Sequence, residues 1–239
     1  MADVIKLFQY NTLNALFAGL FDGSLTIGEL LKHGDLGIGT LDSIDGELVV
    51  LDGKAYQTTS KNSQLKVVEV APDTKVPYAA VVPHHAEVVF KQRYETTDKE
   101  LEERIESYYD GANLFRSIKI KGHFKHMHVR MIPEAKSGEK FAEVANRQPE
   151  YTAEDVTGTI VGFWTPEMFH GVSVAGYHIH FISDDFSFGG HVMDFVMTDG
   201  TVEIGPVDQL DQRFPVQDRN YLFAKFNLDE LKEDINKSE

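Results

Sequence analysis

Three histidines in the last third of the chain have the spacing of a metal site. His178 and His180 are separated by one residue in the run Gly-Tyr-His-Ile-His-Phe-Ile, residues 176–182. Alternate side chains of a β-strand leave the same face, so both imidazoles share one face while bulky apolar groups fill the other. His191 follows after a polar stretch that ends in two glycines. The sequence therefore predicts two strands that carry three imidazoles on one face.

The polar stretch between these strands predicts a hairpin. A register that pairs His180 with His191 places their Cβ atoms about 5 Å apart on the same face. His178 is then the diagonal neighbour of His191, still within reach of an imidazole. We expect the three rings to converge on one point.

Such a ligand set favours a catalytic metal over a structural one. Three neutral imidazoles leave a divalent ion its full charge and an open coordination position for substrate or water. The chain has no cysteine, which excludes disulfides, thiol nucleophiles and thiolate-bound zinc or iron–sulfur sites. Any bound metal must therefore be held by histidine and carboxylate side chains.

A second His-x-His pair, His126 and His128, stands on another predicted strand. Lys125 and Arg130 flank it, and no third histidine follows it in hairpin register. Positive neighbours oppose a divalent cation, so we interpret this pair as a solvated basic strip. Arg130 shares a face with both histidines, and a guanidinium on a cleft wall can bind a carboxylate with two hydrogen bonds.

The surrounding elements indicate a sheet-rich, mixed α/β (α+β) chain with a few helices. Helices are predicted over residues 13–20 and after the capping-box patterns that begin at Thr26 and Thr97. Alternating and short apolar patterns, punctuated by turn residues, predict the strands. These cover residues 37–40, 47–51, 55–56, 67–68, 114–120, 124–132, 159–164, 172–174, 177–182, 191–197 and 202–204.

A polar segment over residues 133–157, which contains two prolines, is the best candidate for a domain boundary. We therefore expect two packed sheet-based domains. Residues 1–150 would form an N-terminal mixed α/β domain, and residues 151–239 a β-rich domain with the histidine hairpin and a C-terminal tail. The chain has neither a glycine-rich phosphate loop nor a Gly-x-Ser-x-Gly elbow, so a doubly wound fold is not indicated.

Charge and hydropathy oppose several kinds of partner. The 239-residue chain has 38 acidic and 23 basic residues, a formal net charge of −15, and no basic run long enough to neutralise phosphates. This balance opposes nucleic-acid binding and docking on anionic lipid. No signal peptide and no apolar run of about 20 residues is recognisable. We therefore expect a cytoplasmic protein with no membrane partner that acts on a small molecule such as a carboxylate.

Four motifs resemble those of alpha-acetolactate decarboxylases, and together they span nearly the whole chain. They are Gly-Asp-Leu-Gly-Ile-Gly-Thr (34–40), Leu-Asp-Ser-Ile-Asp-Gly-Glu-Leu (41–48), Gly-Thr-Ile-Val-Gly-Phe-Trp-Thr-Pro (158–166), and the histidine run 176–182 with Gly-Gly-His-Val (189–192). The resemblance implies a two-domain α/β fold and a homodimer. It also implies Zn²⁺ as the cofactor, with His178, His180 and His191 as its ligands.

Further site residues are implied by the same resemblance. Glu47 matches an active-site glutamate near the metal, Arg130 an active-site arginine, and Thr40 a threonine that lines the substrate pocket. The family also uses a glutamate from its C-terminal tail. The nearest match is Glu239, the last residue, with Glu233 as a rival.

The implied reaction suits such a site. 2-Acetolactate, 2-hydroxy-2-methyl-3-oxobutanoate, is a 2-hydroxy-3-oxo acid whose ketone and hydroxyl oxygens can chelate one metal ion. Zinc would polarise the ketone, and loss of CO₂ would leave the electron pair in a zinc-bound enediolate rather than a bare carbanion. Arg130 would orient the carboxylate. Glu47 or Glu239 would deliver a proton to one face, which gives acetoin of a single hand.

Two other classes of function stay open from the residues alone. Three histidines around an open metal position also fit another zinc lyase or a hydratase that activates water. A non-catalytic, cupin-like β-barrel module that binds a metal or a small molecule can carry His-x-His as well. Acetoin formation would favour the decarboxylase, turnover of carbonate or an ester the second enzyme class, and tight metal binding without turnover the module.

Overall fold

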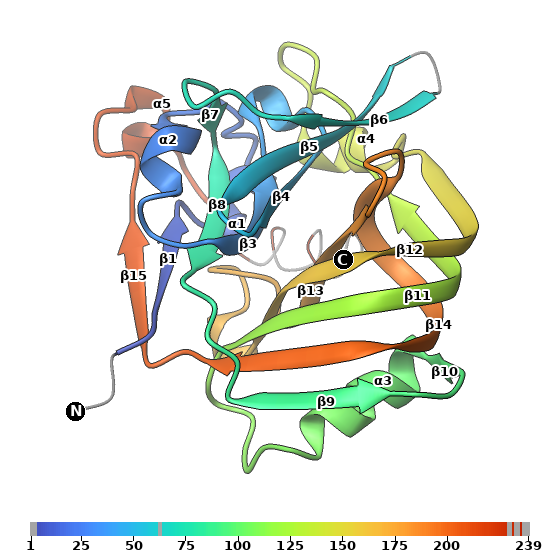
Figure 1. The fold of residues 1–239 in the computed structure, drawn as a ribbon. Coiled ribbons are helices and arrows are strands. Elements are labelled where there is room, and N and C mark those ends of the chain that lie inside the picture. The colour runs from blue at the N-terminus through green and yellow to red at the C-terminus, as the bar shows by residue number, and fades with distance from the viewer. Residues whose placement is uncertain (1–3, 62–63, 229–230, 232–234, 236–239) are drawn as a thin grey trace.

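The computed structural model describes residues 4–61, 64–228, 231 and 235. Within these residues the chain forms two large sheets, a two-stranded ribbon and several short helices (Figure 1). The sheet-rich, mixed α/β class predicted from the sequence is confirmed.

The first sheet has seven strands and is mainly antiparallel. Its order is β15 (Gln209–Arg213), β1 (Lys6–Tyr10), β8 (Tyr78–Val82), β3 (Leu36–Thr40), β4 (Glu47–Leu51), β5 (Lys54–Lys61) and β6 (Gln64–Glu69). The exception is the parallel pair β1 and β15, which joins strands that lie far apart in sequence. The separate ribbon pairs β2 (Leu25–Thr26) with β7 (Lys75–Val76).

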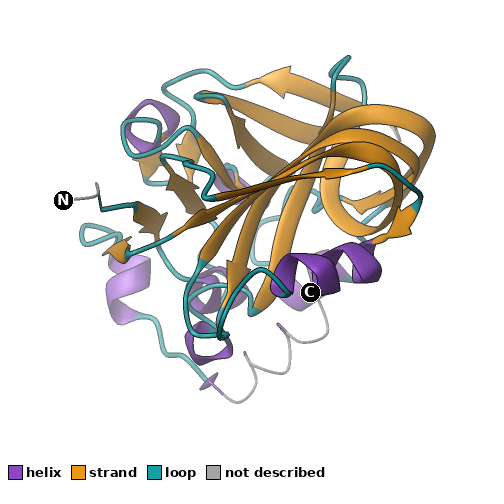
Figure 2. Cartoon of the chain, turned by 60° about the horizontal axis from the view of Figure 1, so that its bottom comes forward, coloured by secondary structure: helices purple, strands orange, loops and turns teal. Residues whose placement is uncertain are grey.

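The second sheet is built around three long strands and closes on itself. Its order is β10 (Thr96–Thr97), β14 (Gly189–Pro206), β11 (Arg116–Arg130), β12 (Glu150–Thr165) and β13 (Gly176–Ser183), and β9 (Val88–Gln92) also pairs with β14. Because β13 pairs with β14 as well as with β12, four strands form a ring, seen as the curl of strands in Figure 2. The histidine hairpin is the pair that closes this ring.

The helices are short and lie outside the sheets. They are α1 (Leu13–Phe17), α2 (Ile27–Leu30), α3 (Asp98–Glu106), α4 (Phe141–Ala145) and α5 (Arg219–Phe223), with 3₁₀ turns at Asp42–Ile44 and Glu167–Phe169. The capping box predicted at Thr97 is confirmed, because its hydroxyl accepts from the Glu100 N–H and the Glu100 carboxylate accepts from the Thr97 N–H. The Thr26 hydroxyl caps α2 by accepting from the Glu29 N–H.

Apolar side chains from both sheets meet in a shared core. One buried cluster combines residues of the two sheets with Phe115 and Val207, which lie just outside β11 and β14. Its sheet residues are Leu7, Leu36, Ile38, Val49, Ala80 and Val82 of the first sheet and Val161, Phe163 and Ile182 of the second. A second cluster fills the ring, where Phe124 lies edge-to-face against Phe181 and Phe195 at 5.3 and 5.6 Å between centroids. Such aromatic pairs add about 0.5–1.5 kcal/mol beyond their buried area.

Some predicted strands are parts of longer ones, and some segments differ from the prediction. Residues 116–120 and 124–130 of two predicted strands belong to β11, whereas residues 172–174 form a loop with one isolated bridge. The polar segment 133–157 contains α4 and the first half of β12, whose side chains are exposed or half-buried and so carry no apolar pattern. Strands on both sides of residue 150 enter the second sheet. The division into domains 1–150 and 151–239 stays a prediction.

Candidate metal centre and its pocket

The hairpin of β13 and β14 has the predicted register. His180 pairs with His191, and the two residues after His180 pair with the two glycines before His191. The rings of His178, His180 and His191 have centroids 5.1–5.5 Å apart. One ring nitrogen of each lies within 4.8 Å of the others. Among the described residues, these three histidines are close enough together to hold a metal ion.

A glycine in β12 lets the neighbouring strand approach behind His178. Gly162 pairs with Ile179 and has a φ of +157°. A Cβ at this position would lie 2.1 Å from the carbonyl oxygen of His178, far inside van der Waals contact. Any larger residue would push β13 away from β12 and move the first histidine.

Burial keeps the three imidazoles neutral. It lowers the pKa of His180 to about 4, against a hydrogen bond to the Leu48 carbonyl that raises this pKa and with a smaller lowering effect of the Arg130 charge. Burial also lowers the pKa of His178 and of His191 well below the usual value, and the repulsion that a protonated ring would meet from Arg130 and from the neighbouring histidines adds to this. Neutral imidazole is the form that binds a metal ion.

The donor atoms of the site fit a metal ion. Nδ1 of His180 donates to the Leu48 carbonyl oxygen at 2.9 Å, so its Nε2 carries a lone pair, which faces Oε2 of Glu47 at 3.5 Å. Two acceptors face each other favourably only when a proton or a cation lies between them. Within the described residues, His180 Nε2 and His178 Nδ1 are buried without a hydrogen-bond partner. Neutral nitrogens with a nearby carboxylate are a donor set that zinc accepts.

Glu47 is held inside the same pocket. It begins β4, and its side chain is buried, although the sequence pattern without the resemblance suggests a surface charge beside a turn. Oε1 accepts a hydrogen bond from the backbone N–H of Ile132 at 2.9 Å, which leaves Oε2 toward His180. The carboxylate therefore has one oxygen bound to the backbone and one oxygen that faces His180.

A tight turn before β4 sets the position of Glu47. The Thr40 hydroxyl donates to the Gly46 carbonyl oxygen at 2.8 Å, and the Gly46 N–H donates to the Ile132 carbonyl oxygen at 3.0 Å. Gly46 has a φ of +76°, a conformation that favours glycine. Thr40 lines the same cavity as the histidines, and its hydroxyl also fixes the turn from which Glu47 starts.

Arg130 ends β11 beside the histidines. It pairs with His191 on β14 and with Glu150 on β12, and its side chain is buried. Its Nη2 lies 3.2 Å from Nε2 of His191. Because a guanidinium only donates hydrogen bonds, Nε2 of His191 is the acceptor in this contact and carries a lone pair.

One small cavity of about 40 Å³ connects these groups. The predicted residues that line it are Thr40, Glu47, Arg130, His178, His180 and His191. Its other lining side chains are Leu13, Leu16, Phe17, Tyr78, Ile132, Phe141 and Gln148. The tail residues Glu239 and Glu233 lie outside the described residues.

The sequence did not predict the apolar side chains and Tyr78 as lining residues of this cavity. The spacing of Leu13, Leu16 and Phe17 predicted a helix with an apolar face, but nothing in the sequence placed that face over the histidines. Tyr78 lies on a fully buried strand, and its hydroxyl is 3.2 Å from Ser173 Oγ. No sequence signal distinguished it from a core residue.

The other His-x-His pair lies in a different environment. His126 Nδ1 is 2.6 Å from Glu154 Oε1, and His128 lies 2.8 Å from Asp194 and 3.2 Å from Glu150. The interpretation of this pair as a basic strip was wrong, because the strip also contains acidic side chains. They come from β12 and β14 and are not visible in the sequence around the two histidines. We call His126, His128, Glu150, Glu154 and Asp194 the outer ladder; its side chains are half-buried or exposed.

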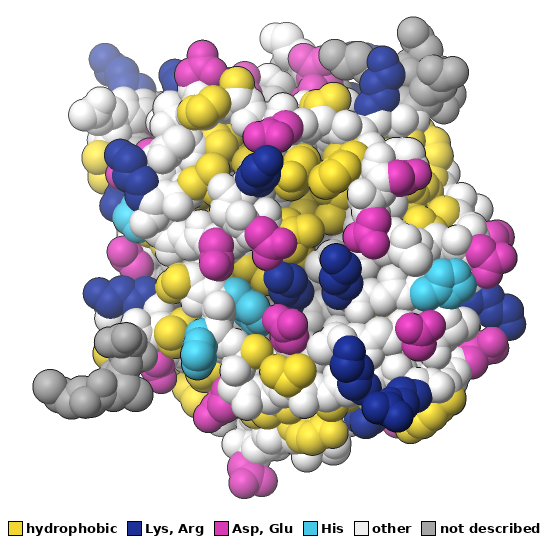
Figure 3. Space-filling model, viewed as in Figure 1, with side chains coloured by type: hydrophobic (Ala, Val, Ile, Leu, Met, Phe, Trp, Pro, Cys, Tyr) yellow, Lys and Arg dark blue, Asp and Glu magenta, His cyan; other side chains and the backbone are white. Residues whose placement is uncertain are grey.

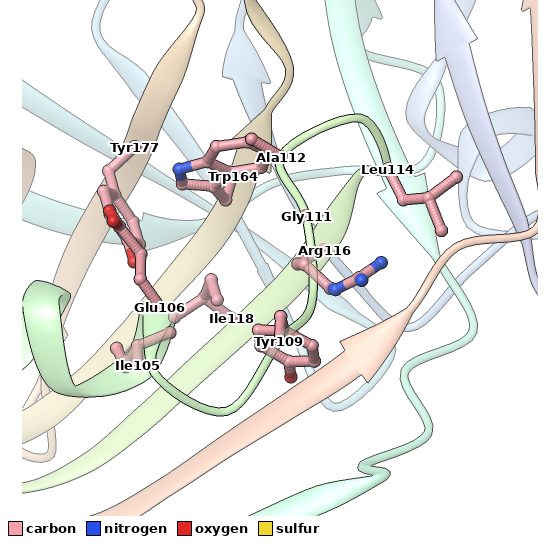
Figure 4. Close-up of a pocket in the computed structure, with 10 residues that line it drawn as sticks. All are labelled: Ile105, Glu106, Tyr109, Gly111, Ala112, Leu114, Arg116, Ile118, Trp164 and Tyr177. Atoms are coloured by element: carbon pink, nitrogen blue, oxygen red, sulfur yellow. The ribbon is translucent and has the colours of Figure 1, made fainter.

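A larger cavity, of about 250 Å³, shares no lining residue with the histidine pocket. Tyr109, Trp164 and Tyr177 surround it, and the Arg116 guanidinium lies 4.3 Å from the Tyr109 ring centre (Figure 4). Burial raises the pKa of Tyr109 to about 12. Tyr177 precedes His178 and points to the opposite face of β13. With no histidine and one carboxylate, Glu106, among its lining residues, this cavity does not resemble a metal site.

The surface of the described residues carries both signs of charge. On the face shown in Figure 3, Lys and Arg side chains are interspersed with Asp and Glu rather than gathered in one patch. No helix in the described part of the chain is long and apolar enough to cross a membrane.

Comparisons with known proteins agree with the site. The model of the family described as alpha-acetolactate decarboxylase matches residues 7–228. The chain is 75% identical to an alpha-acetolactate decarboxylase of Streptococcus thermophilus and 69% identical to one of Lactococcus lactis subsp. cremoris, each over 100% of both chains.

Solved structures give the same result. A Staphylococcus aureus protein of unknown function, similar to alpha-acetolactate decarboxylase, superposes with a TM-score of 0.93 at 42% identity over 98% of this chain and 100% of that one. The alpha-acetolactate decarboxylase of Bacillus subtilis strain 168 also gives 0.93, at 31% identity over 98% and 99% of the two chains. The chain belongs to the alpha-acetolactate decarboxylase family.

Proposed function

We propose that this enzyme converts 2-acetolactate to acetoin and CO₂ with one Zn²⁺ held by His178, His180 and His191. The observation that carries the proposal is the meeting of three neutral, buried imidazoles with Glu47 and Arg130 in one small pocket. The family relationship supports the reaction, and the unpartnered ring nitrogens support the metal.

A zinc ion bound there would act as a Lewis acid on the ketone and hydroxyl oxygens of the substrate. The protein's own groups then account for orientation and charge. Arg130 presents several N–H donors on one side of the pocket, where a carboxylate can be bound bidentately. This holds the bond that breaks in a fixed direction and balances the negative charge as CO₂ leaves.

Proton delivery falls to a glutamate. CO₂ loss leaves an enediolate, which must be protonated on carbon from one side to give acetoin of one hand. Glu47 supports this role because one of its oxygens is fixed by the Ile132 N–H and the other faces the histidines. The family resemblance offers Glu239, with Glu233 as its rival, as the alternative donor. Thr40 would act as a positioning residue through the turn before Glu47.

The test combines metal analysis with product analysis on the purified full-length enzyme. We expect about one zinc per chain, and equal amounts of CO₂ and single-handed acetoin from racemic acetolactate. Removal of zinc with a chelator should abolish turnover, and added zinc should restore it. Full activity of the zinc-free protein would contradict the metal, and an absence of acetoin would contradict the reaction.

Two properties that the sequence predicts belong to the same proposal. We place the enzyme in the cytoplasm, and we propose a homodimer. Light scattering should then give about twice the chain mass of 26.9 kDa, whereas a mass equal to that of one chain would contradict the dimer.

A further inference from the structure

The histidine pocket has two chemically different sides. Its polar side carries the three histidines with Glu47 and Arg130. Its apolar side, which we call the wall, is formed by Leu13, Leu16, Phe17, Ile132 and Phe141. All five wall side chains are only 2–5% exposed. Since one small cavity touches both sides, a molecule bound to the polar groups also contacts the wall.

The wall is firmly supported. The rings of Phe17 and Phe141 stack with centroids 3.7 Å apart, which joins α1 to α4. The backbone N–H groups of Leu13 and Asn14 donate to carbonyl oxygens of the loop at residues 171–172. The wall shares one buried cluster with Ile44, Tyr78, Val144, Val174, Leu231 and Ile235. A close-packed cluster of this kind resists displacement, so the wall sets a defined limit to the pocket.

The space between the two sides is small. The cavity has a volume of about 40 Å³, above the roughly 10–15 Å³ that a cavity needs to hold one water molecule. The proposed substrate has three oxygen-bearing groups that match the polar side. Its two methyl groups, one on C2 and one on the ketone carbon, are left for the wall. An additional methylene on either group would be placed against the wall, whose side chains are closely packed.

We infer that the wall determines how large an alkyl group on C2 the enzyme accepts, and that the size of the Leu16 side chain contributes to this limit. This inference rests on the proposed function and adds a specificity-determining residue to it. Leu16 is the most direct test among the wall residues. Phe17 and Phe141 support each other by stacking, and the Ile132 N–H holds Glu47, so changing any of these three would disturb more than the pocket volume.

The experiment compares two substrates on each zinc-loaded enzyme: 2-hydroxy-2-methyl-3-oxobutanoate and its 2-ethyl homologue. One methylene in an apolar pocket changes kcat/KM by about 10- to 200-fold, so we expect the wild type to prefer the methyl substrate by this order. Leu16→Ala should raise the ethyl-to-methyl ratio of kcat/KM by about tenfold or more. Leu16→Phe should lower this ratio below that of the wild type.

A matched control removes a similar amount of apolar volume outside the pocket. Phe21 packs against the same cluster, with its ring 6.4 Å from that of Phe141, but it does not line the histidine cavity. Phe21→Ala should leave the substrate ratio unchanged, even if it lowers stability. Each ratio comes from a single preparation, so the folded fraction cancels. Leu16→Val provides a milder variant if Leu16→Ala folds poorly.

The outcomes distinguish the two proposals. An unchanged ratio in Leu16→Ala or Leu16→Val and in Leu16→Phe, with a wild type that produces acetoin, overturns the role of the wall and leaves the proposed function standing. An equal shift in Phe21→Ala also overturns it, because the effect would then be general loosening. A wild type that releases no acetoin overturns the proposed function and this inference with it.

Discussion

Two His-x-His pairs on one sheet have opposite surroundings. His178 and His180 are buried, neutral and joined by a third imidazole. His126 and His128 are half-buried and bonded to carboxylates from both neighbouring strands. The same three-residue pattern therefore produces a candidate metal centre in one place and an ionic ladder in the other. What differs is burial and the residues that neighbouring strands place opposite the pair.

The largest expected effect separates the two pairs by metal content. His180→Ala should lose most of its zinc, and so should His178→Ala and His191→Ala. Acetoin production should fall by more than the about 10- to 100-fold that loss of an outer hydrogen-bond partner costs. His128→Ala, the matched change in the outer ladder, should keep both zinc and activity. About one zinc per chain in all three site variants, by elemental analysis, would refute the assigned ligands.

A second comparison sets one glutamate against another. Glu47→Gln keeps an acceptor for the Ile132 N–H but removes the proton, so kcat should fall by about 10²- to 10⁴-fold while zinc stays bound. Glu154→Gln in the outer ladder should have near wild-type kinetics. If Glu47→Gln retains the wild-type kcat, the proton must come from another group, and Glu239 becomes the first candidate.

A third comparison uses two arginines on β11. Arg130→Lys keeps the charge but loses the planar fork, so kcat/KM should fall by about 10²-fold with zinc retained. Arg116→Lys, at the other end of the same strand and beside the larger cavity, should leave kcat/KM near that of the wild type. Steady-state kinetics with metal analysis decides this, and equal kinetics for the two variants would remove Arg130 from the mechanism.

The smallest effect concerns the stability of the outer ladder. Burial lowers the pKa of His128, but hydrogen bonds and charge from Asp194 and Glu150 outweigh it, and the net shift is upward. A raised pKa in the folded state adds stability below the unfolded value of about 6.5, and this stability is lost as the pH rises through the folded value.

His128→Gln should therefore lower the free energy of unfolding more at pH 5.5 than at pH 8. Both carboxylates are more than half exposed, so we expect about 1 kcal/mol or less, and less in high salt. Urea unfolding at the two pH values measures the difference. An equal loss at both would show that protonation of His128 contributes nothing to stability.

The sequence predicted those parts of the site that depend on local pattern. The hairpin register followed from two short strands and the stretch between them, and it is confirmed by the pairing of His180 with His191. The roles of Glu47, Arg130 and Thr40 came from family motifs, and the structure brings all three into the histidine pocket. Their catalytic roles stay predictions.

Other features depend on contacts between distant segments. The first half of β12 shows solvent-accessible side chains on both faces, so no apolar periodicity marked it, and Glu150 and Glu154 could not be paired with the histidines of β11. Leu16 and Phe141 are far apart in sequence, and only packing of α1 and α4 brings them to one cavity. A helical spacing shows that a face is buried but not against what.

The doubly paired strand β13 has a thermodynamic consequence. Where it carries His180, backbone hydrogen bonds fix it to β12 on one side and to β14 on the other. The strand pairing therefore fixes the backbone positions of the three histidines without help from a bound ion. If zinc binds as proposed, we therefore expect the metal-free enzyme to keep its fold, unlike small domains that unfold without zinc.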